Sequence, residues 1–225
     1  MARGIKIAID GPAAAGKSTI AKITAEKLGY TYIDTGAMYR ALTHKALSQN
    51  IDTTDGEKLE RLVRNTAIVL SPSTKGQAVI VDGHDVSEAI RLQQVTANVS
   101  AVAAHTGVRQ LMVEKQRQLA NGTGVVMDGR DIGTAVLPDA ELKIFMTASV
   151  EERALRRHLE NGKRGITTSL AELQAEISER DRADSEREVS PLKQAEDALL
   201  IDTTAMSIEE VANQISELAE KRMRL

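Results

Sequence analysis

The segment Gly11–Thr19 has the residue types and the spacing of a phosphate-binding loop. It matches the pattern G-x-x-x-x-G-K-[ST] at every fixed position. Backbone N–H groups in such a glycine-containing turn converge on phosphate oxygens, and the N-terminus of the following helix adds a positive dipole. Lys17 supplies a cation for the β- and γ-phosphates, and the hydroxyl of Ser18 is a ligand for Mg²⁺. We therefore predict that a nucleoside triphosphate binds at Gly11, Pro12, Ala13, Ala14, Ala15, Gly16, Lys17, Ser18 and Thr19.

Arginine residues form a second group whose chemistry suits phosphate. Arg40 and Arg130 each follow a segment that we predict to be a strand, and loops at the carboxyl ends of strands are where open α/β sheets bind ligands. Between residues 151 and 187 further arginines are interspersed with carboxylates, which is typical of a clamp that closes on a phosphate group. For each one the alternative is a solvated helix face. These arginines are Arg153, Arg156, Arg157, Arg164, Arg180, Arg182 and Arg187.

Strand-like and helix-like segments alternate along the chain in the way that places such loops at one edge of a parallel sheet. Apolar or β-branched runs predict strands at 5–9, 30–33, 125–128, 142–146 and 199–201. Helical periodicity or a capping box predicts helices at 17–28, 37–48, 57–65 and 106–119, and helices that begin at Ser149, Ser169 and Ser207. The predicted fold is α/β, with a parallel sheet flanked by helices.

The segment of about 64–99 differs from the rest of the chain in its pattern of short strands and turns. Two short strand patterns, at 67–70 and 78–81, surround a Ser-Pro-Ser turn, and Asp82-Gly83 marks a further turn. These signals predict an insertion that carries its own small sheet.

The composition excludes several classes of protein. The 225 residues carry a net charge of −3, which removes the usual electrostatic argument for binding nucleic acid or a membrane surface. The chain contains no Cys, so disulfides, thiolate metal sites and a Cys nucleophile are excluded. No apolar run approaches the roughly 18 residues needed to span a bilayer. We expect a cytoplasmic monomer with small-molecule substrates and with neither a nucleic-acid nor a membrane partner.

Four motifs, in this order along the chain, resemble those of the bacterial cytidylate kinases: Gly11–Thr19, Asp34–Arg40, Asp128–Gly133 and Arg180–Arg187. The resemblance covers nearly the whole chain and implies a P-loop kinase core with a parallel β-sheet flanked by helices. It also implies an inserted small mixed α/β subdomain that binds the nucleoside monophosphate, and a short lid. The implied activity is transfer of the γ-phosphoryl group of ATP to CMP or dCMP, with Mg²⁺ as cofactor.

The same resemblance implies limits for these parts and roles for single residues. The chain would be one domain over 1–225, with a core at about 1–34, 101–152 and 168–225, a subdomain at about 35–100 with its insert at about 64–99, and a lid at about 153–167. The implied CMP ligands are Ser100, Arg109 and Asp131 for the base, Arg40 and Arg130 for the phosphate, and Arg180, Asp184 and Arg187 for the pentose and phosphate. Thr35 stands where some members have Ser, which keeps the hydroxyl.

The chemistry of these residues agrees with those roles. Cytosine offers an amino donor and two acceptors, so a carboxylate beside a guanidinium, such as Asp131 with Arg109, could read it, whereas uracil would present its O4 acceptor to Asp131. No general base is needed, because the second pKa of a phosphate monoester is near 6 and the acceptor is largely a dianion. Positioning and cations can then carry catalysis. The proposed phosphate clamp is Lys17, Arg40, Arg130, Arg157, Arg180 and Arg187, and Asp128 could contact Mg²⁺ through water.

Two other functions fit the loops and arginines. One is a P-loop kinase for another small acceptor, such as UMP, a sugar or shikimate. The other is a nucleotide-binding regulatory module without transfer activity. Pairing of Asp131 with Arg109 favours a base over a sugar, and a response of ADP release to added acceptor would separate a kinase from a regulatory module.

Overall fold

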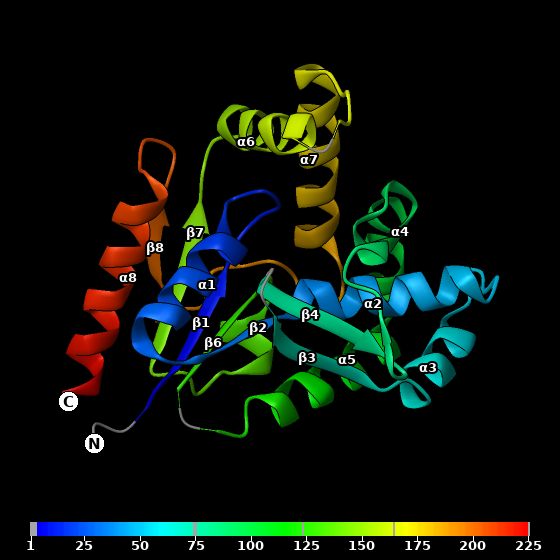
Figure 1. Ribbon diagram of the computed structural model, residues 1–225, viewed down its shortest axis with the longest axis horizontal. Helices are drawn as coiled ribbons and strands as arrows, with labels where there is room; N and C mark the ends of the chain where they lie inside the picture. The colour runs from blue at the N-terminus through cyan, green and yellow to red at the C-terminus, as the bar shows by residue number, and fades with distance from the viewer. Residues whose placement is uncertain (1–3, 74–75, 123, 164, 225) are drawn as a thin grey trace. The chain divides into compact units, whose positions relative to one another are not determined.

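The computed structural model describes residues 4–73, 76–122, 124–163 and 165–224. These residues form two compact units of the chain that Figure 1 shows. The first unit contains the chain up to Tyr32 and from Ala120 onward, and the second unit is Ile33–Leu119. Each unit has its own hydrophobic core. Within the part of the chain that the structure describes, no helix is both long enough and apolar enough to cross a membrane.

A five-stranded sheet forms the centre of the first unit, in the order β2-β6-β1-β7-β8. β1 pairs in parallel with β6 and with β7, so that Ile7 lies opposite Val126 and Leu142. The carboxyl ends of these strands therefore lie at one edge, which confirms the predicted parallel α/β fold. The strands are β1 (Lys6–Asp10), β2 (Thr31–Asp34), β6 (Val125–Gly129), β7 (Leu142–Thr147) and β8 (Leu199–Asp202).

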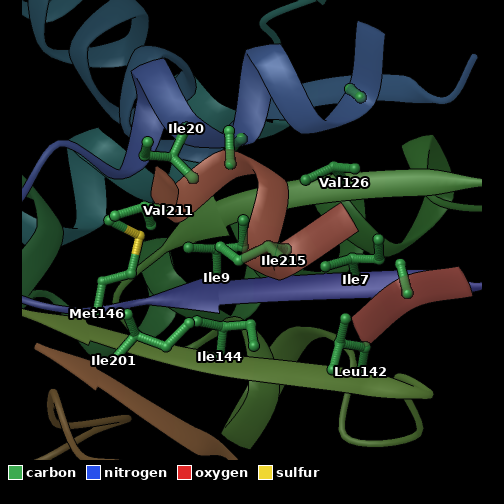
Figure 2. Packing of buried hydrophobic residues seen from close by; sticks show 14 of the residues in the cluster. Ile7, Ile9, Ile20, Val126, Leu142, Ile144, Met146, Ile201, Val211 and Ile215 are labelled. Atoms are coloured by element: carbon green, nitrogen blue, oxygen red, sulfur yellow. The ribbon is translucent and has the colours of Figure 1, made fainter. Parts of the chain in front are cut away.

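Helices α1 (Lys17–Leu28) and α8 (Ile208–Met223) contribute side chains to the core of this sheet. In Figure 2, Ile9 of β1 lies together with Ile20 of α1 and Ile215 of α8. Side chains two apart in a strand share a face, so Ile7 joins Ile9 in the same cluster, and neither has any exposed surface. Burial of this face is what fixes β1, and with it the start of the loop that follows.

Two further helices of the first unit pack against each other: α6 (Val150–Lys163) and α7 (Leu170–Glu186) (Figure 1). Ala154 of α6 and two apolar residues of α7, Leu173 and Ile177, form a small buried cluster. Capping boxes at Ser169 and Ser207 begin α7 and α8 as predicted, with each Ser side chain and the Glu three residues later bonded to the other's backbone N–H. A short π-helical turn, η2 (Ile132–Val136), follows β6.

The second unit holds the small sheet that the sequence predicts, an antiparallel β3-β4-β5. Helix α4 (Gln93–Ala104) is not predicted by the sequence. Its N-cap is Leu92, whose side chain cannot cap a helix, so the usual signal for a helix start is absent. Val95, Val99 and Val102 do follow a helical period. The predicted limits of the subdomain and of the lid stay predictions. The elements are α2 (Thr35–Ser48), α3 (Gly56–Arg64), β3 (Ile68–Ser73), β4 (Gly76–Val81), β5 (His84–Asp85), η1 (Ala89–Arg91), α4 (Gln93–Ala104) and α5 (Thr106–Leu119).

Asp10, the last residue of β1, ties this strand to the turn after β6. Its two carboxylate oxygens accept the backbone N–H groups of Ile132, at 2.8 Å, and of Gly133, at 2.7 Å. Burial raises the pKa of Asp10 to about 6, although the two N–H donors act in the opposite direction. The folded protein therefore binds this proton more tightly than the unfolded chain does.

We predict that Asp10→Asn destabilises the first unit and changes how stability depends on pH. Asn has one acceptor oxygen, so one of the two buried N–H groups loses its partner, at a cost of about 1–3 kcal/mol. Because the pKa of Asp10 is raised, its contribution to the free energy of unfolding is complete below about pH 4 and is lost as the pH rises through about 6, by about 3 kcal/mol at most. The deficit of the Asn variant should therefore shrink between pH 5 and pH 8. Urea unfolding at both pH values measures this, and a deficit that stays constant would contradict it.

Candidate functional site

Residues 11–16 form the turn between β1 and α1. Gly11 has a φ of 149°, and a Cβ atom on it would lie 2.0 Å from the carbonyl oxygen of Met146, so only glycine lets the chain pass β7 here. The N-cap of α1 is Gly16, which has no side chain to occupy the first N–H groups of the helix. Those N–H groups and the dipole of α1 can therefore face an anion, as the motif predicts. Ser18 and Thr19 lie exposed in the first turn of α1.

Lys17 is a buried cation within this loop. Only 5% of its surface is exposed, and its Nζ donates to the carbonyl oxygen of Pro12 at 2.6 Å. Burial, together with the nearby charge of Arg130, brings the pKa of Lys17 well below its ordinary value, although the carboxylates of Asp128 and Asp10 act in the opposite direction. A phosphate close to Nζ would favour the charged form of Lys17.

Asp128, near the end of β6, is a buried carboxylate beside the loop. Its Oδ2 accepts the hydroxyl of Ser18 at 2.8 Å, and its Oδ1 accepts the hydroxyl of Tyr32 at 2.9 Å. The sequence predicts the nearness of Asp128 to Ser18 but not the part of Tyr32. The sequence indicates only that Tyr32 lies in a predicted strand just before a motif, and this is a weak signal for a residue of the site.

The Ser18–Asp128 pair fits the needs of Mg²⁺. This ion prefers hard oxygen ligands and usually keeps several waters while binding one or two protein groups and the phosphates of its substrate. A hydroxyl and a carboxylate that already lie in contact supply such a partial ligand set. Among the residues that the structure describes, no group of three or more His, Cys, Asp or Glu side chains could hold a metal ion without a substrate.

Three arginines and two carboxylates from the turn after β6 and from α7 form a charged cluster. Nε of Arg130 donates to Oδ2 of Asp184 at 2.8 Å, and Nη1 of Arg187 lies 3.5 Å from Oδ1 of the same carboxylate. Nη2 of Arg187 also lies 3.8 Å from Oδ1 of Asp131. Burial alone would raise the pKa of Asp184, but the charges of Arg130, Arg180 and Arg187 hold it below its ordinary value. The structure thus brings together five of the predicted CMP ligands.

The remaining predicted CMP ligands, Thr35, Arg40, Ser100 and Arg109, belong to the second unit. Thr35 begins α2, Ser100 is half-buried in α4, and Nη2 of Arg40 lies 3.5 Å from Oδ2 of Asp34. Arg109 of α5 is 2% exposed: its Nη1 donates to the carbonyl oxygen of Ala103 at 3.1 Å, and its guanidinium lies 5.5 Å from the centre of the Tyr39 ring. A carbonyl dipole and a ring face both stabilise a buried guanidinium.

The arginines of α6 have different surroundings from one another. Arg157, which the sequence places in the phosphate clamp, is partly exposed with its Nε 4.0 Å from Glu160, and its role stays a prediction. Arg156 donates from Nη2 to the carbonyl oxygen of Thr203 at 2.6 Å. Arg153 is buried and donates to backbone carbonyls, so it is not an exposed clamp residue. Of the predicted lid, residue 164 lies outside the described residues.

Comparison with known proteins agrees with this geometry. The family model described as "Cytidylate kinase" matches residues 7–221. The cytidylate kinase of Lysinibacillus sphaericus is 60% identical over 99% of this chain and 100% of its own length, and that of Bacillus subtilis is 58% identical over 100% of both. A crystal structure of an uncharacterized protein from Eubacterium ventriosum, 12% identical, covers 97% of this chain and 99% of its own with a TM-score of 0.52, and so shares the fold. This chain therefore belongs to the cytidylate kinase family.

Proposed function

We propose that this protein transfers the γ-phosphoryl group of ATP to CMP or dCMP and releases ADP and CDP or dCDP. The observation that carries the proposal is the occurrence, in one unit, of the phosphate-binding loop, the Ser18–Asp128 pair and the charged cluster around Asp184. A loop for a triphosphate and a separate set of arginines and carboxylates are what transfer between two nucleotides requires. Membership of the family supports CMP as the acceptor. The expectation of a cytoplasmic monomer stays a prediction.

The reaction needs alignment and positive charge more than a base. The acceptor phosphate is largely a dianion at neutral pH, so it can attack the γ-phosphorus without losing a proton to the protein. Nζ of Lys17 would move from the carbonyl of Pro12 to the β- and γ-phosphate oxygens. Arg130 and Arg187 would bind the acceptor phosphate, which competes with Asp184 for their N–H groups. Ser18 would hold Mg²⁺ directly and Asp128 through water, and the bound ion neutralises charge on the β- and γ-phosphates.

We propose that Asp131 takes part in the selection of cytosine. The buried carboxylate of Asp131 can accept the amino group of cytosine, whereas it would meet the O4 acceptor of uracil. We include Thr35, Arg40, Ser100 and Arg109 in the proposed CMP ligands, and Arg157 with Arg180 in the phosphate clamp. Asp184 is proposed to accept a sugar hydroxyl while Arg130 and Arg187 hold its carboxylate in place.

A coupled assay of ADP release with a panel of acceptors tests the proposed function. We expect CMP and dCMP to have the highest specificity constants, with UMP well behind and with AMP, GMP and shikimate near background. A specificity constant for UMP or AMP equal to that for CMP would overturn the assignment. ADP release that does not respond to any acceptor would instead favour a regulatory module.

Lys17→Ala should remove most of the activity. Loss of one such electrostatic contact typically raises the barrier by about 3–4 kcal/mol, or two to three orders of magnitude in turnover. The fold should remain, because Nζ of Lys17 donates to a carbonyl of its own loop and burial already disfavours its charge. Lys22→Ala, an exposed position in the same helix, is the control. Near-normal turnover of folded Lys17→Ala would exclude the loop from the mechanism.

Substitutions at Asp131 and Asp184 should separate base reading from pentose and phosphate binding. Asp131→Ala should reduce the ratio of the specificity constants for CMP and UMP, by a factor that corresponds to about 1–3 kcal/mol. Asp184→Ala should weaken the use of CMP and dCMP alike by about 2–5 kcal/mol, because Arg130 and Arg187 lose their carboxylate. Specificity constants for CMP, dCMP and UMP measure both effects, with exposed Glu186→Ala as control. The roles are reversed if only Asp184→Ala changes the ratio of CMP to UMP use.

A further inference from the structure

We propose that Arg153 of α6 and Asp181 of α7 are positioning residues that hold the backbone of Ala13 and thereby set the shape of the phosphate-binding loop for ATP. The sequence places Arg153 among the clamp arginines and gives Asp181 no role. The inference rests on the proposed function only in that the loop binds ATP.

Both backbone polar groups of Ala13 are bonded to this Arg–Asp pair. The N–H of Ala13 donates to Oδ1 of Asp181 at 3.1 Å, and Nη1 of Arg153 donates to the carbonyl oxygen of Ala13 at 3.0 Å. The same Nη1 donates to Oδ2 of Asp181, which closes a ring of three contacts. Nε of Arg153 donates to the carbonyl oxygen of Ala148 at 2.9 Å and so fixes the guanidinium to the end of β7. The pair therefore holds one loop residue from both sides.

The burial of Arg153 suits this role better than that of an exposed phosphate clamp. Arg153 is 5% exposed, and its guanidinium donates to two backbone carbonyls and to one carboxylate. A buried guanidinium needs several hydrogen bonds and a nearby negative charge, both of which this arrangement supplies. A buried ion pair could be replaced by apolar side chains if its only task were to join α6 to α7. Its bonds to Ala13 require charged groups with this geometry.

The residue after Ala13 shows why the loop needs such support. Ala14 has a φ of 59°, in the left-handed region that is unfavourable for a residue with a Cβ. Such a conformation persists only where its surroundings enforce it. Ala14 packs against the apolar cluster of Ala154, Leu173 and Ile177, and its preceding residue is held by Arg153 and Asp181. The apolar cluster and the Arg153–Asp181 pair thus fix this turn, which orients the backbone N–H groups that follow it.

Asp181→Asn tests the proposal, because the amide keeps the shape of the side chain but can accept from only one of its two partners. We expect the dissociation constant for ATP, measured by titration calorimetry with Mg²⁺ present, to rise about 10-fold or more. The KM for CMP should change less than about twofold. Glu179→Gln, an exposed carboxylate of the same helix, is the matched control and should bind ATP as the unaltered protein does.

A second substitution distinguishes loop positioning from general structural support. Glycine adopts a positive φ without strain, so Ala14→Gly removes the need to enforce the turn. In the Asp181→Asn background, Ala14→Gly should lower the dissociation constant for ATP at least about threefold. If the affinity were lost because α6 packs less well on α7, Ala14→Gly would not restore it. Should Asp181→Asn fail to fold, Arg153→Lys serves instead, since one ammonium cannot reproduce the fixed guanidinium geometry.

The results that would overturn the positioning role differ from those that would contradict the proposed function. The proposal is overturned if Asp181→Asn lowers the melting temperature but leaves the dissociation constant for ATP within twofold, or if Ala14→Gly restores no affinity. Failure of the unaltered protein and of Glu179→Gln to bind ATP would instead contradict the proposed function. Raised ATP dissociation constants with rescue by Ala14→Gly would support the positioning role.

Discussion

The close passage of the chain at Gly11 is the constraint on which the nucleotide loop depends. Where β1 ends, the backbone runs so near the carbonyl of Met146 that no side chain fits. The chain must therefore turn sharply at this point, and the turn places Lys17 and Ser18 at the edge of the sheet where Asp128 lies near the end of β6. Parallel pairing of β1 with β6 and β7 explains why residues more than a hundred positions apart meet at this edge.

Around this edge, charges are paired before any substrate binds. Asp10 is held by backbone N–H groups, Asp128 by two hydroxyls, and Asp184 by arginines. Each carboxylate thus has partners that offset part of its desolvation. Arg130 and Arg187 are aligned by Asp184, so a phosphate meets guanidinium groups that already have restricted freedom. Such preorganisation lowers the ordering cost of binding.

How much could be predicted from the sequence depends on how local each signal is. The loop at 11–19, the strands of the sheet and the capping boxes at Ser169 and Ser207 are encoded within a few residues, and all of these elements appear as predicted. Helix α4 lacks a capping signal at Leu92 and is missed. The contact of Tyr32 with Asp128 and that of Asp181 with Ala13 join distant segments, and no spacing in the sequence encodes them. A list of arginines likewise could not separate buried Arg153 from partly exposed Arg157.

The contact of Lys17 with the carbonyl of Pro12 bears on how quickly a nucleotide can be captured. An ammonium in water must shed its hydration shell before it can contact a phosphate, and that step adds to the barrier for association. Here Nζ is already buried and donates to a neutral oxygen of its own loop. Exchange of this carbonyl for a phosphate oxygen therefore requires less dehydration of Nζ than contact by an exposed ammonium would, because much of that dehydration took place when the protein folded.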